Sequence, residues 1–204
     1  MKNLNLRSLF KLRSLALTGI LALAVFAVSC NKEDSILPAP GNEALKSGKA
    51  VKKGAMTIAE IVKADDGEFD ILQSLLEKYN LLSVFEGTDQ YTVFAPTDAA
   101  FETLFAYLDD NGVVLTDEQI VNTLLYHVTD GRRAANSVLP MKDGQMKTIT
   151  TLLGQTFSVD NTGMIYTASN RMSSIVTDEA GVTYNISASN GIIHVISAVL
   201  VPEF

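Results

Sequence analysis

Few residues in this sequence could carry out chemistry. The chain has two histidines, His127 and His194, and a single cysteine, Cys30. A histidine can act as a general base or bind a metal, but both histidines lie in apolar segments. A transition-metal site built on them would need carboxylates to complete it. The simpler explanation is a histidine hydrogen-bonded to backbone or to a hydroxyl, so we predict no catalytic residue, no metal site and no cofactor.

Other polar segments also have structural explanations. Asp109–Gly112 hints at calcium binding but lacks the alternate spacing of an EF-hand loop, so we expect a turn that ends a helix. The acids at 65–70 precede a helix, where negative charge favours the helix dipole. Arg132 and Arg133 form an exposed-looking basic pair. This pair could contact an anionic glycan or a partner. The simpler explanation is that it lies in a solvated loop.

The first 29 residues have the pattern of a secretory signal peptide. Four bases, and no acid, lie in the first 13 residues, and an apolar run of 14 residues, Leu15–Val28, comes after them. That run is shorter than the roughly 20 residues that span a bilayer. The segment Ala27-Val28-Ser29-Cys30 resembles the lipobox of bacterial lipoproteins. The resemblance implies cleavage before Cys30 and attachment of lipid to its thiol; an ordinary cleaved signal and a chance cysteine are the alternative.

A tether is expected between the anchor and the domain. Residues 30–55 contain prolines and glycines and show no sustained apolar period, which is typical of a flexible linker. The first residues after Cys30, Asn31–Ser35, resemble an export signal that places lipoproteins on the outer face of the outer membrane in one group of Gram-negative bacteria. We therefore expect an outer membrane lipoprotein exposed at the cell surface, with the membrane contacted through the lipid alone.

The charge of the mature chain argues against nucleic-acid binding. Removal of residues 1–29 takes away four bases and leaves 12 bases and 23 acids, a net charge of −11. Nucleic-acid binding is dominated by neutralisation of phosphates, so an acidic chain gains nothing from it.

The elements of the remaining chain predict one monomeric α+β domain over residues 56–204. Thr57 and Glu60 form a capping box, and Thr116 begins a second one. Apolar residues recur at helical spacing in the first half. The second half changes to strand-like segments, which are Ile149–Leu153, Thr156–Val159, Met164–Ala168, Ser174–Thr177, Val182–Ile186 and Ile192–Val201. Asn190-Gly191 suits a tight turn with positive φ. Helices gathered first and strands second favour an α+β fold.

Three segments together resemble the fasciclin (FAS1) domain family. They are Tyr91–Phe101, Leu124–Val128 and Ala188–Pro202, in that order. The resemblance covers essentially residues 57–202 and implies a FAS1-like fold, with helices mainly in the N-terminal half packed on a β-rich C-terminal half. It also implies the role of an extracellular adhesion and interaction module.

The resemblance suggests which residues contact a partner. Tyr126 and His127 match one proposed adhesion element of the family, although their apolar flanks predict that both are largely buried. In animal members an Asp-Ile pair before the closing segment is linked to integrin recognition. Asn185 and Ile186 stand at the matching positions here, so the acid is absent and integrin binding is not carried over.

The sequence leaves three hypotheses for function. The first is a non-catalytic adhesion module whose partner is an extracellular or surface protein or a glycan. The second is an accessory lipoprotein that holds a small apolar or glycan ligand in a pocket between helices and sheet, which several hundred Å3 of apolar-lined space would favour. The third, a hydrolase, would need a concave site with convergent titratable groups of perturbed pKa.

Overall fold

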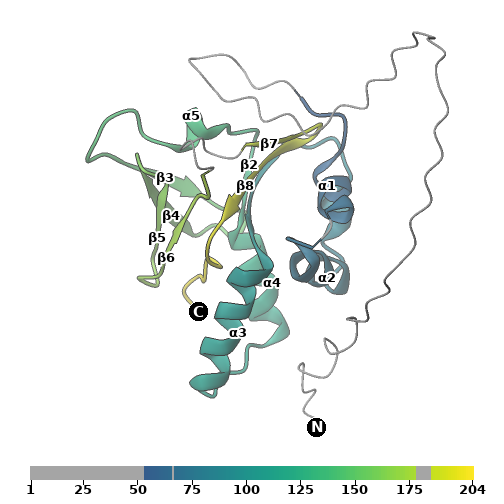
Figure 1. Cartoon of the computed structure of the whole chain (residues 1–204), viewed down its shortest axis with the longest axis vertical. Helices are drawn as coiled ribbons and strands as arrows, with labels where there is room; N and C mark the ends of the chain where they lie inside the picture. The colour runs from purple at the N-terminus through teal and green to yellow at the C-terminus, as the bar shows by residue number, and fades with distance from the viewer. Residues whose placement is uncertain (1–52, 66, 178–184) are drawn as a thin grey trace, which may run out of the picture. The chain divides into compact units, whose positions relative to one another are not determined.

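A computed structural model describes residues 53–65, 67–177 and 185–204 of the chain (Figure 1). The predicted signal segment 1–29, Cys30 and almost all of the predicted tether 30–55 lie outside the described residues. No helix among the residues that are described is long and apolar enough to cross a membrane. The described residues thus comprise most of the predicted domain and the three residues that precede it.

The helices of the described residues lie mainly in the first half of the domain, as predicted. They are α1 (Ile58–Ala64), α2 (Asp70–Lys78), the 3-10 helix η2 (Leu82–Phe85), α3 (Asp98–Asp110), α4 (Asp117–Tyr126) and α5 (Ala135–Val138). Both predicted capping boxes are confirmed, because the Thr57 and Thr116 side chains each accept a hydrogen bond from the third helical residue. These caps stabilise their helices by about 1 kcal/mol each.

The strands form two sheets of four strands. Sheet A has the order β2-β1-β8-β7, in which β1 pairs parallel with β8 and the other pairs are antiparallel. Sheet B is the antiparallel meander β3-β4-β5-β6. Their bounds are β1 (Tyr91–Pro96), β2 (Val128–Asp130), β3 (Met146–Thr150), β4 (Thr156–Asp160), β5 (Met164–Thr167), β6 (Met172–Ser174), β7 (Ile186–Ala188) and β8 (Gly191–Ile196).

Sheet A lies between α1 and α2 on one side and sheet B on the other (Figure 1). Val93 and Val195 belong to the core cluster shared with the helices, whereas Phe94 and Ile196 belong to a second cluster shared with sheet B. Successive residues of a strand point to opposite faces, so a central strand covered on both sides is apolar throughout. All six residues of β8 are accordingly buried.

Several predicted strand bounds are wrong, for reasons of tertiary structure. β8 ends at Ile196 rather than Val201, because Ser197 N donates to Ser174 O and draws the chain toward sheet B. β3 covers 146–150 rather than 149–153, because Thr151 N donates to Gln155 O and closes a turn. β6 covers 172–174; of the predicted remainder, Ile175 and Thr177 are isolated bridge residues, and Ile175 pairs with Ile196. Residues 182–184 of another predicted strand lie outside the described residues.

The glycine of Asn190-Gly191 has a different role from the predicted one. Gly191 does not adopt positive φ. A Cβ atom there would instead overlap the Tyr91 carbonyl oxygen on β1 and lie 2.7 Å from Ile58 Cδ1. Glycine is required here by the close approach of β8, β1 and α1, which the local sequence does not reveal.

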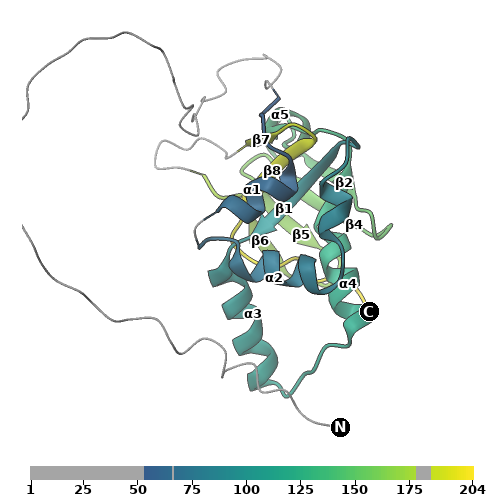
Figure 2. The ribbon, with the colours of Figure 1, turned by 90° about the vertical axis from the view of Figure 1, so that its right-hand side faces the viewer.

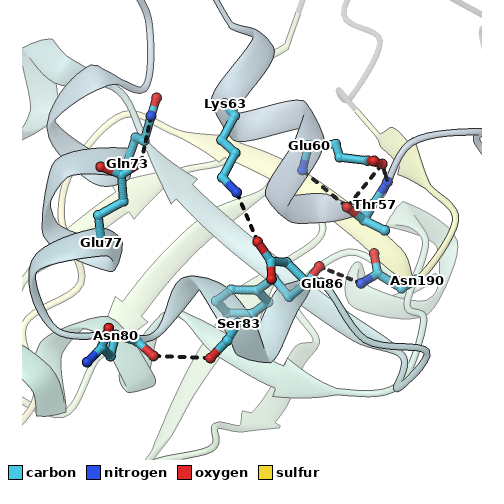
Figure 3. A network of polar contacts seen from close by, with 10 residues as sticks. Thr57, Glu60, Lys63, Gln73, Glu77, Asn80, Ser83, Glu86 and Asn190 are labelled. Atoms are coloured by element: carbon cyan, nitrogen blue, oxygen red, sulfur yellow. Dashed lines mark hydrogen bonds and ion pairs between the residues drawn. The ribbon is translucent and has the colours of Figure 1, made fainter.

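Asn190 ties the β7–β8 turn to the helical layer. Its side chain is buried; Oδ1 accepts from Ile58 N at 2.8 Å, and Nδ2 donates to Phe85 O at 2.7 Å and Gly87 O at 3.0 Å. Figure 3 shows Asn190 beside the Thr57–Glu60 capping box and the Lys63–Glu86 ion pair. One amide thus satisfies three backbone groups from two separate helical segments.

The chain enters the domain along the same turn. Gly54 N donates to Ala188 O at 3.3 Å, and Ser189 N donates to Met56 O at 2.7 Å. A Cβ atom on Gly54 would overlap the Ser187 carbonyl oxygen. The entry point therefore lies at the β7 end of the domain, away from the far ends of α3 and α4 (Figures 1 and 2).

Candidate functional site

Tyr126 and His127 lie in the interior at the end of α4. The exposed fraction of Tyr126 is 0% and that of His127 is 3%, which confirms the predicted burial. Tyr126 Oη donates to Thr156 O on β4 at 2.8 Å. The Tyr126 ring packs edge-on against Phe157. This element joins α4 to sheet B and is not part of the surface.

The two ring nitrogens of His127 are both engaged with backbone. Nδ1 donates to Thr123 O at 2.6 Å, and Nε2 accepts from Leu200 N at 2.8 Å. Because an acceptor nitrogen must be unprotonated, this pattern requires the neutral ring. Burial lowers the pKa of His127 to about 4, and the hydrogen bond to Thr123 opposes this only in part. His127 is therefore neutral at physiological pH and connects α4 to the segment after β8.

His194 also has a backbone partner. It is fully buried in the middle of β8, and its Nε2 donates to Arg133 O at 2.9 Å. Its ring lies 5.4 Å from that of Phe94, between centroids. Both histidines thus have the structural role that their apolar surroundings predict, and neither presents a nitrogen to an open cleft.

Arg132 is not the exposed base that the sequence suggested. Its Nη1 donates to Ala188 O at 2.7 Å and to Gly191 O, and its Nη2 donates to Ser187 Oγ at 2.6 Å. Burial lowers the pKa of the guanidinium from its ordinary value. The planar fork of arginine suits several acceptors in one plane, which here come from the β7–β8 hairpin.

Arg133 is half-buried and is also hydrogen-bonded within the domain. Its backbone N donates to Thr92 Oγ1 at 2.8 Å, and its Nε donates to Asp130 O at 3.1 Å. The prediction of a solvated basic pair is thus wrong for Arg132, and Arg133 also has backbone partners.

Asn185 and Ile186 lie beside the arginine segment. Asn185 Oδ1 accepts from Ala135 N at 2.8 Å, at the first residue of α5. Ile186 begins β7 and packs against the helical core cluster. The Asn185–Ala135 and Arg132–Ser187 hydrogen bonds together bring segments 132–135 and 185–188 side by side. Asn185, like Arg132, is engaged within the domain.

The acidic segments do not form a metal site in the part of the chain that is described. Asp110 is the last residue of α3 and Asn111 is its C-cap, as the predicted helix-ending turn requires. Asp70 lies in the first turn of α2. No group of three or more potential metal ligands occurs among the described residues.

The outward face of sheet B carries exposed groups that we did not predict from the sequence. We call Met146, Ser158, Asp160, Tyr166 and Met172 the sheet-B face. Met146 lies opposite Asp160, and Tyr166 lies between Ser158 and Met172 in the strand register. The exposed fractions are 53% for Met146, 36% for Tyr166 and 61% for Met172. The alternation in β4, where Phe157 and Val159 are buried, is the signal that could have revealed this face.

Tyr166 and Asp160 hold one another in place on this face. Tyr166 Oη donates to Asp160 Oδ2 at 3.1 Å. Asp160 Oδ1 accepts from Thr162 N at 2.8 Å and from Met164 N at 3.0 Å. Desolvation raises the pKa of Asp160, but the bonds from Thr162, Met164 and Tyr166 outweigh it, so the pKa is lowered overall. The bond to Asp160 raises the pKa of Tyr166. The pair is therefore a carboxylate and a neutral phenol.

A groove of about 710 Å3 runs over this face. It is lined by Gly144, Gln145, Met146, Thr156, Phe157, Ser158, Asp160, Asn161, Tyr166, Thr167 and Ala168. The second hypothesis placed a pocket between helices and sheet, where the helical core cluster is packed. The groove lies on the opposite side of the β layers and combines apolar with hydrogen-bonding groups, so it is suited to binding.

Comparison with known proteins identifies the family of this chain. The fasciclin domain family matches residues 67–202. Protein sll1483 of Synechocystis is 30% identical over 157 residues, covering 76% of this chain and 78% of that protein. Transforming growth factor-beta-induced protein ig-h3 of Sus scrofa is 27% identical over 146 residues, covering 72% of this chain but only 19% of that protein.

A solved structure shares the fold. It contains a FAS1 domain pair from the insect cell adhesion molecule fasciclin I, with a TM-score of 0.53 and 15% identity. The match covers 72% of this chain and 51% of that chain. The predicted α+β fold of FAS1 type is confirmed by this likeness.

Proposed function

The chain belongs to the fasciclin domain family, and from that premise we propose that it is a non-catalytic interaction module, held by lipid on Cys30 at the surface of a bacterial cell. The single observation that supports a contact role most strongly is the sheet-B face, where methionine and tyrosine side chains are exposed side by side. Tyrosine and methionine are enriched at protein interfaces.

The chemistry of the domain supports a non-catalytic role. General acid–base catalysis needs a titratable group that reaches a substrate. His127 and His194 are buried, and each bonds to backbone inside the fold. Arg132 is engaged with the β7–β8 hairpin in the same way. The side chains of His127, His194 and Arg132 thus form hydrogen bonds that connect elements of the fold.

The N-terminal sequence supports anchoring. Residues 1–29 have the basic and apolar regions of a signal, and Ser29-Cys30 resembles a lipobox. A lipoprotein of this type carries more than one acyl chain, which is what stable attachment to a membrane requires. The adhesion role of the insect relative agrees with a surface location.

Membrane fractionation tests the anchor. We expect the wild-type protein in the membrane pellet and labelled by radioactive palmitate, and the Cys30→Ala variant in the soluble fraction without label. Ser35→Ala is the matched control, because it changes a small polar residue in the predicted tether but leaves the lipobox intact. Cys30→Ala protein that still sediments with membranes, or wild-type protein without label, would overturn the anchoring proposal.

Protease treatment of intact cells tests surface display. The wild-type domain should be degraded by added proteinase K while a periplasmic marker enzyme stays intact. Survival of the wild-type protein until the outer membrane is permeabilised would place it on the inner side and would contradict display.

A further inference from the structure

The groove on the sheet-B face has the dimensions of a small-ligand site. It is lined by β4, the Gly144–Met146 segment and the end of β5. Its volume of about 710 Å3 falls within the range of roughly 300–1,000 Å3 that is typical of such sites. A space of this size accommodates one or two six-membered rings.

The groove contains a fixed aromatic surface. Tyr166 is 36% exposed, and its hydroxyl is held by Asp160 at 3.1 Å. Asp160 is held in turn by Thr162 and Met164. The ring is thus positioned before any ligand arrives, which lowers the entropy cost of binding. Met146, on the other side of Asp160, adds a flexible apolar contact.

Polar groups line the groove together with the aromatic ring. Ser158 and Thr156 supply hydroxyls from β4, and Gln145 and Asn161 supply amides from the adjoining turns. Asn161 is oriented by donating from Nδ2 to Asp143 Oδ1 at 2.7 Å. Hydroxyl and amide groups each offer both donors and acceptors, as do the hydroxyls of a sugar. A purely apolar ligand would leave these groups desolvated without partners, which is costly.

The charge of the groove selects among sugars. Asp160 is the one charged side chain among the groove's lining residues. Its pKa is lowered, so it is ionised at neutral pH. An ionised carboxylate accepts hydrogen bonds from sugar hydroxyls but repels a uronate or a sulfate.

We infer that this groove binds a neutral saccharide of one or two rings, with one ring face stacked on Tyr166 and its hydroxyls bonded by Asp160 and the polar side chains around it. The inference rests on the proposed function, because it names the partner class of the interaction module as a neutral glycan.

Methionine methyl NMR tests this inference on the full-length lipoprotein. The protein is labelled with 13C-methyl methionine and extracted in a detergent without a sugar headgroup. Maltose, cellobiose, lactose and N,N′-diacetylchitobiose are titrated separately, with glucuronate as the anionic comparison. The Met146 methyl lies in the groove and reports binding there, whereas the Met56 methyl, on the chain before α1, serves as the reference.

We expect at least one of the neutral disaccharides to shift the Met146 signal saturably and to bind at least about tenfold more tightly than glucuronate. Tyr166→Ala should weaken that binding about tenfold or more, because it removes the stacking surface. Tyr79→Ala is the matched control, since Tyr79, at the end of α2, also donates its hydroxyl to an aspartate, Asp117, but lies outside the groove, so its loss should leave binding unchanged.

Three results of the titration would overturn the inference: no neutral sugar that moves the Met146 signal, equal affinity for glucuronate, or unaltered binding by the Tyr166→Ala variant. A protein partner that covers the sheet-B face in the absence of sugar binding would also overturn it, while leaving the proposed interaction module intact. Failure of membrane anchoring would contradict the proposed function without altering the sugar titration, so the two failures are distinguishable.

Discussion

The Nε2 atom of His127 accepts a hydrogen bond from the backbone N–H of Leu200 at 2.8 Å. The same ring donates from Nδ1 to Thr123 O, so a single buried side chain connects α4 to the segment after β8. Protonation of Nε2 would remove the acceptor and place a charge in the core. The histidine of the Tyr-His element is therefore a pH-dependent structural contact.

This contact predicts a loss of stability at mildly acidic pH. The pKa of His127 is lowered from 6.5 to about 4, so the folded state holds the neutral ring while the unfolded state takes up a proton. The stabilising contribution is complete above pH 6.5 and is lost as the pH falls toward 4. We expect His127 to account for about 1 kcal/mol of lost unfolding free energy between pH 7.5 and 5.5.

Urea unfolding of the full-length protein at those two pH values measures this effect. His127→Gln keeps one donor and one acceptor but does not titrate, so its unfolding free energy should depend less on pH than that of the wild type. Equal pH dependence in the two proteins would contradict the assignment.

A second prediction concerns the close approach at Gly191. An added Cβ would overlap the Tyr91 carbonyl oxygen and press against Ile58. Gly191→Ala should therefore destabilise the domain by at least about 2 kcal/mol, since β1 and β8 would have to separate. Gly87→Ala is the control, because no atom lies within 4 Å of the added Cβ and its change should stay within about 0.5 kcal/mol. Urea unfolding compares the two variants, and similar midpoints would contradict the close approach of β1 and β8 at Gly191.

A third prediction separates the two neighbouring arginines. Arg132→Lys should cost about 1–3 kcal/mol, because a single ammonium cannot satisfy the Ala188, Gly191 and Ser187 oxygens together. Arg133→Lys should cost less than about 0.5 kcal/mol, because only the Nε bond to Asp130 O is altered. Thermal unfolding of both variants tests the pair, and a larger loss for Arg133→Lys would refute the described role of Arg132.

A fourth prediction tests the buried amide of Asn190. Asn190→Asp preserves the shape but replaces the donor group that faces the Phe85 and Gly87 carbonyl oxygens with an acceptor. We expect a loss of about 2–4 kcal/mol in unfolding free energy, because two buried acceptors lose their donor and face a carboxylate. Asn111→Asp, at the exposed C-cap of α3, should lose about 1 kcal/mol or less. Chemical unfolding measures both losses. Equal losses for the Asn190→Asp and Asn111→Asp variants would contradict the hydrogen bonds described for Asn190.

Local features of the fold could be predicted from sequence. Thr57, Thr97 and Thr116 each cap a helix through residues at most three positions away, so the signal is contained in a short segment. The burial of Tyr126 and His127 could be expected from their apolar flanks. The order of three family-like segments predicted the FAS1 fold, and the comparison with a solved FAS1 structure confirmed it.

Features that depend on long-range pairing could not be predicted. Arg132 looked exposed because its partners, Ser187 and Ala188, are more than 50 positions away along the chain. Gly191 looked like a turn residue because its neighbour Tyr91 is reached only through the parallel pairing of β1 with β8. The sheet-B face was detectable in principle from the alternation in β4, yet its groove needs three strands in register.

Adhesion of intact cells tests the proposed interaction module most directly. Cells that express the wild-type protein, the Cys30→Ala variant or no protein are applied to an array of glycans and extracellular matrix proteins, and the bound cells are counted. We predict that only cells with the wild-type protein gain attachment to at least one arrayed glycan or protein, and that added soluble domain competes for it. Equal attachment of all three strains to every arrayed molecule would contradict a surface-displayed interaction module.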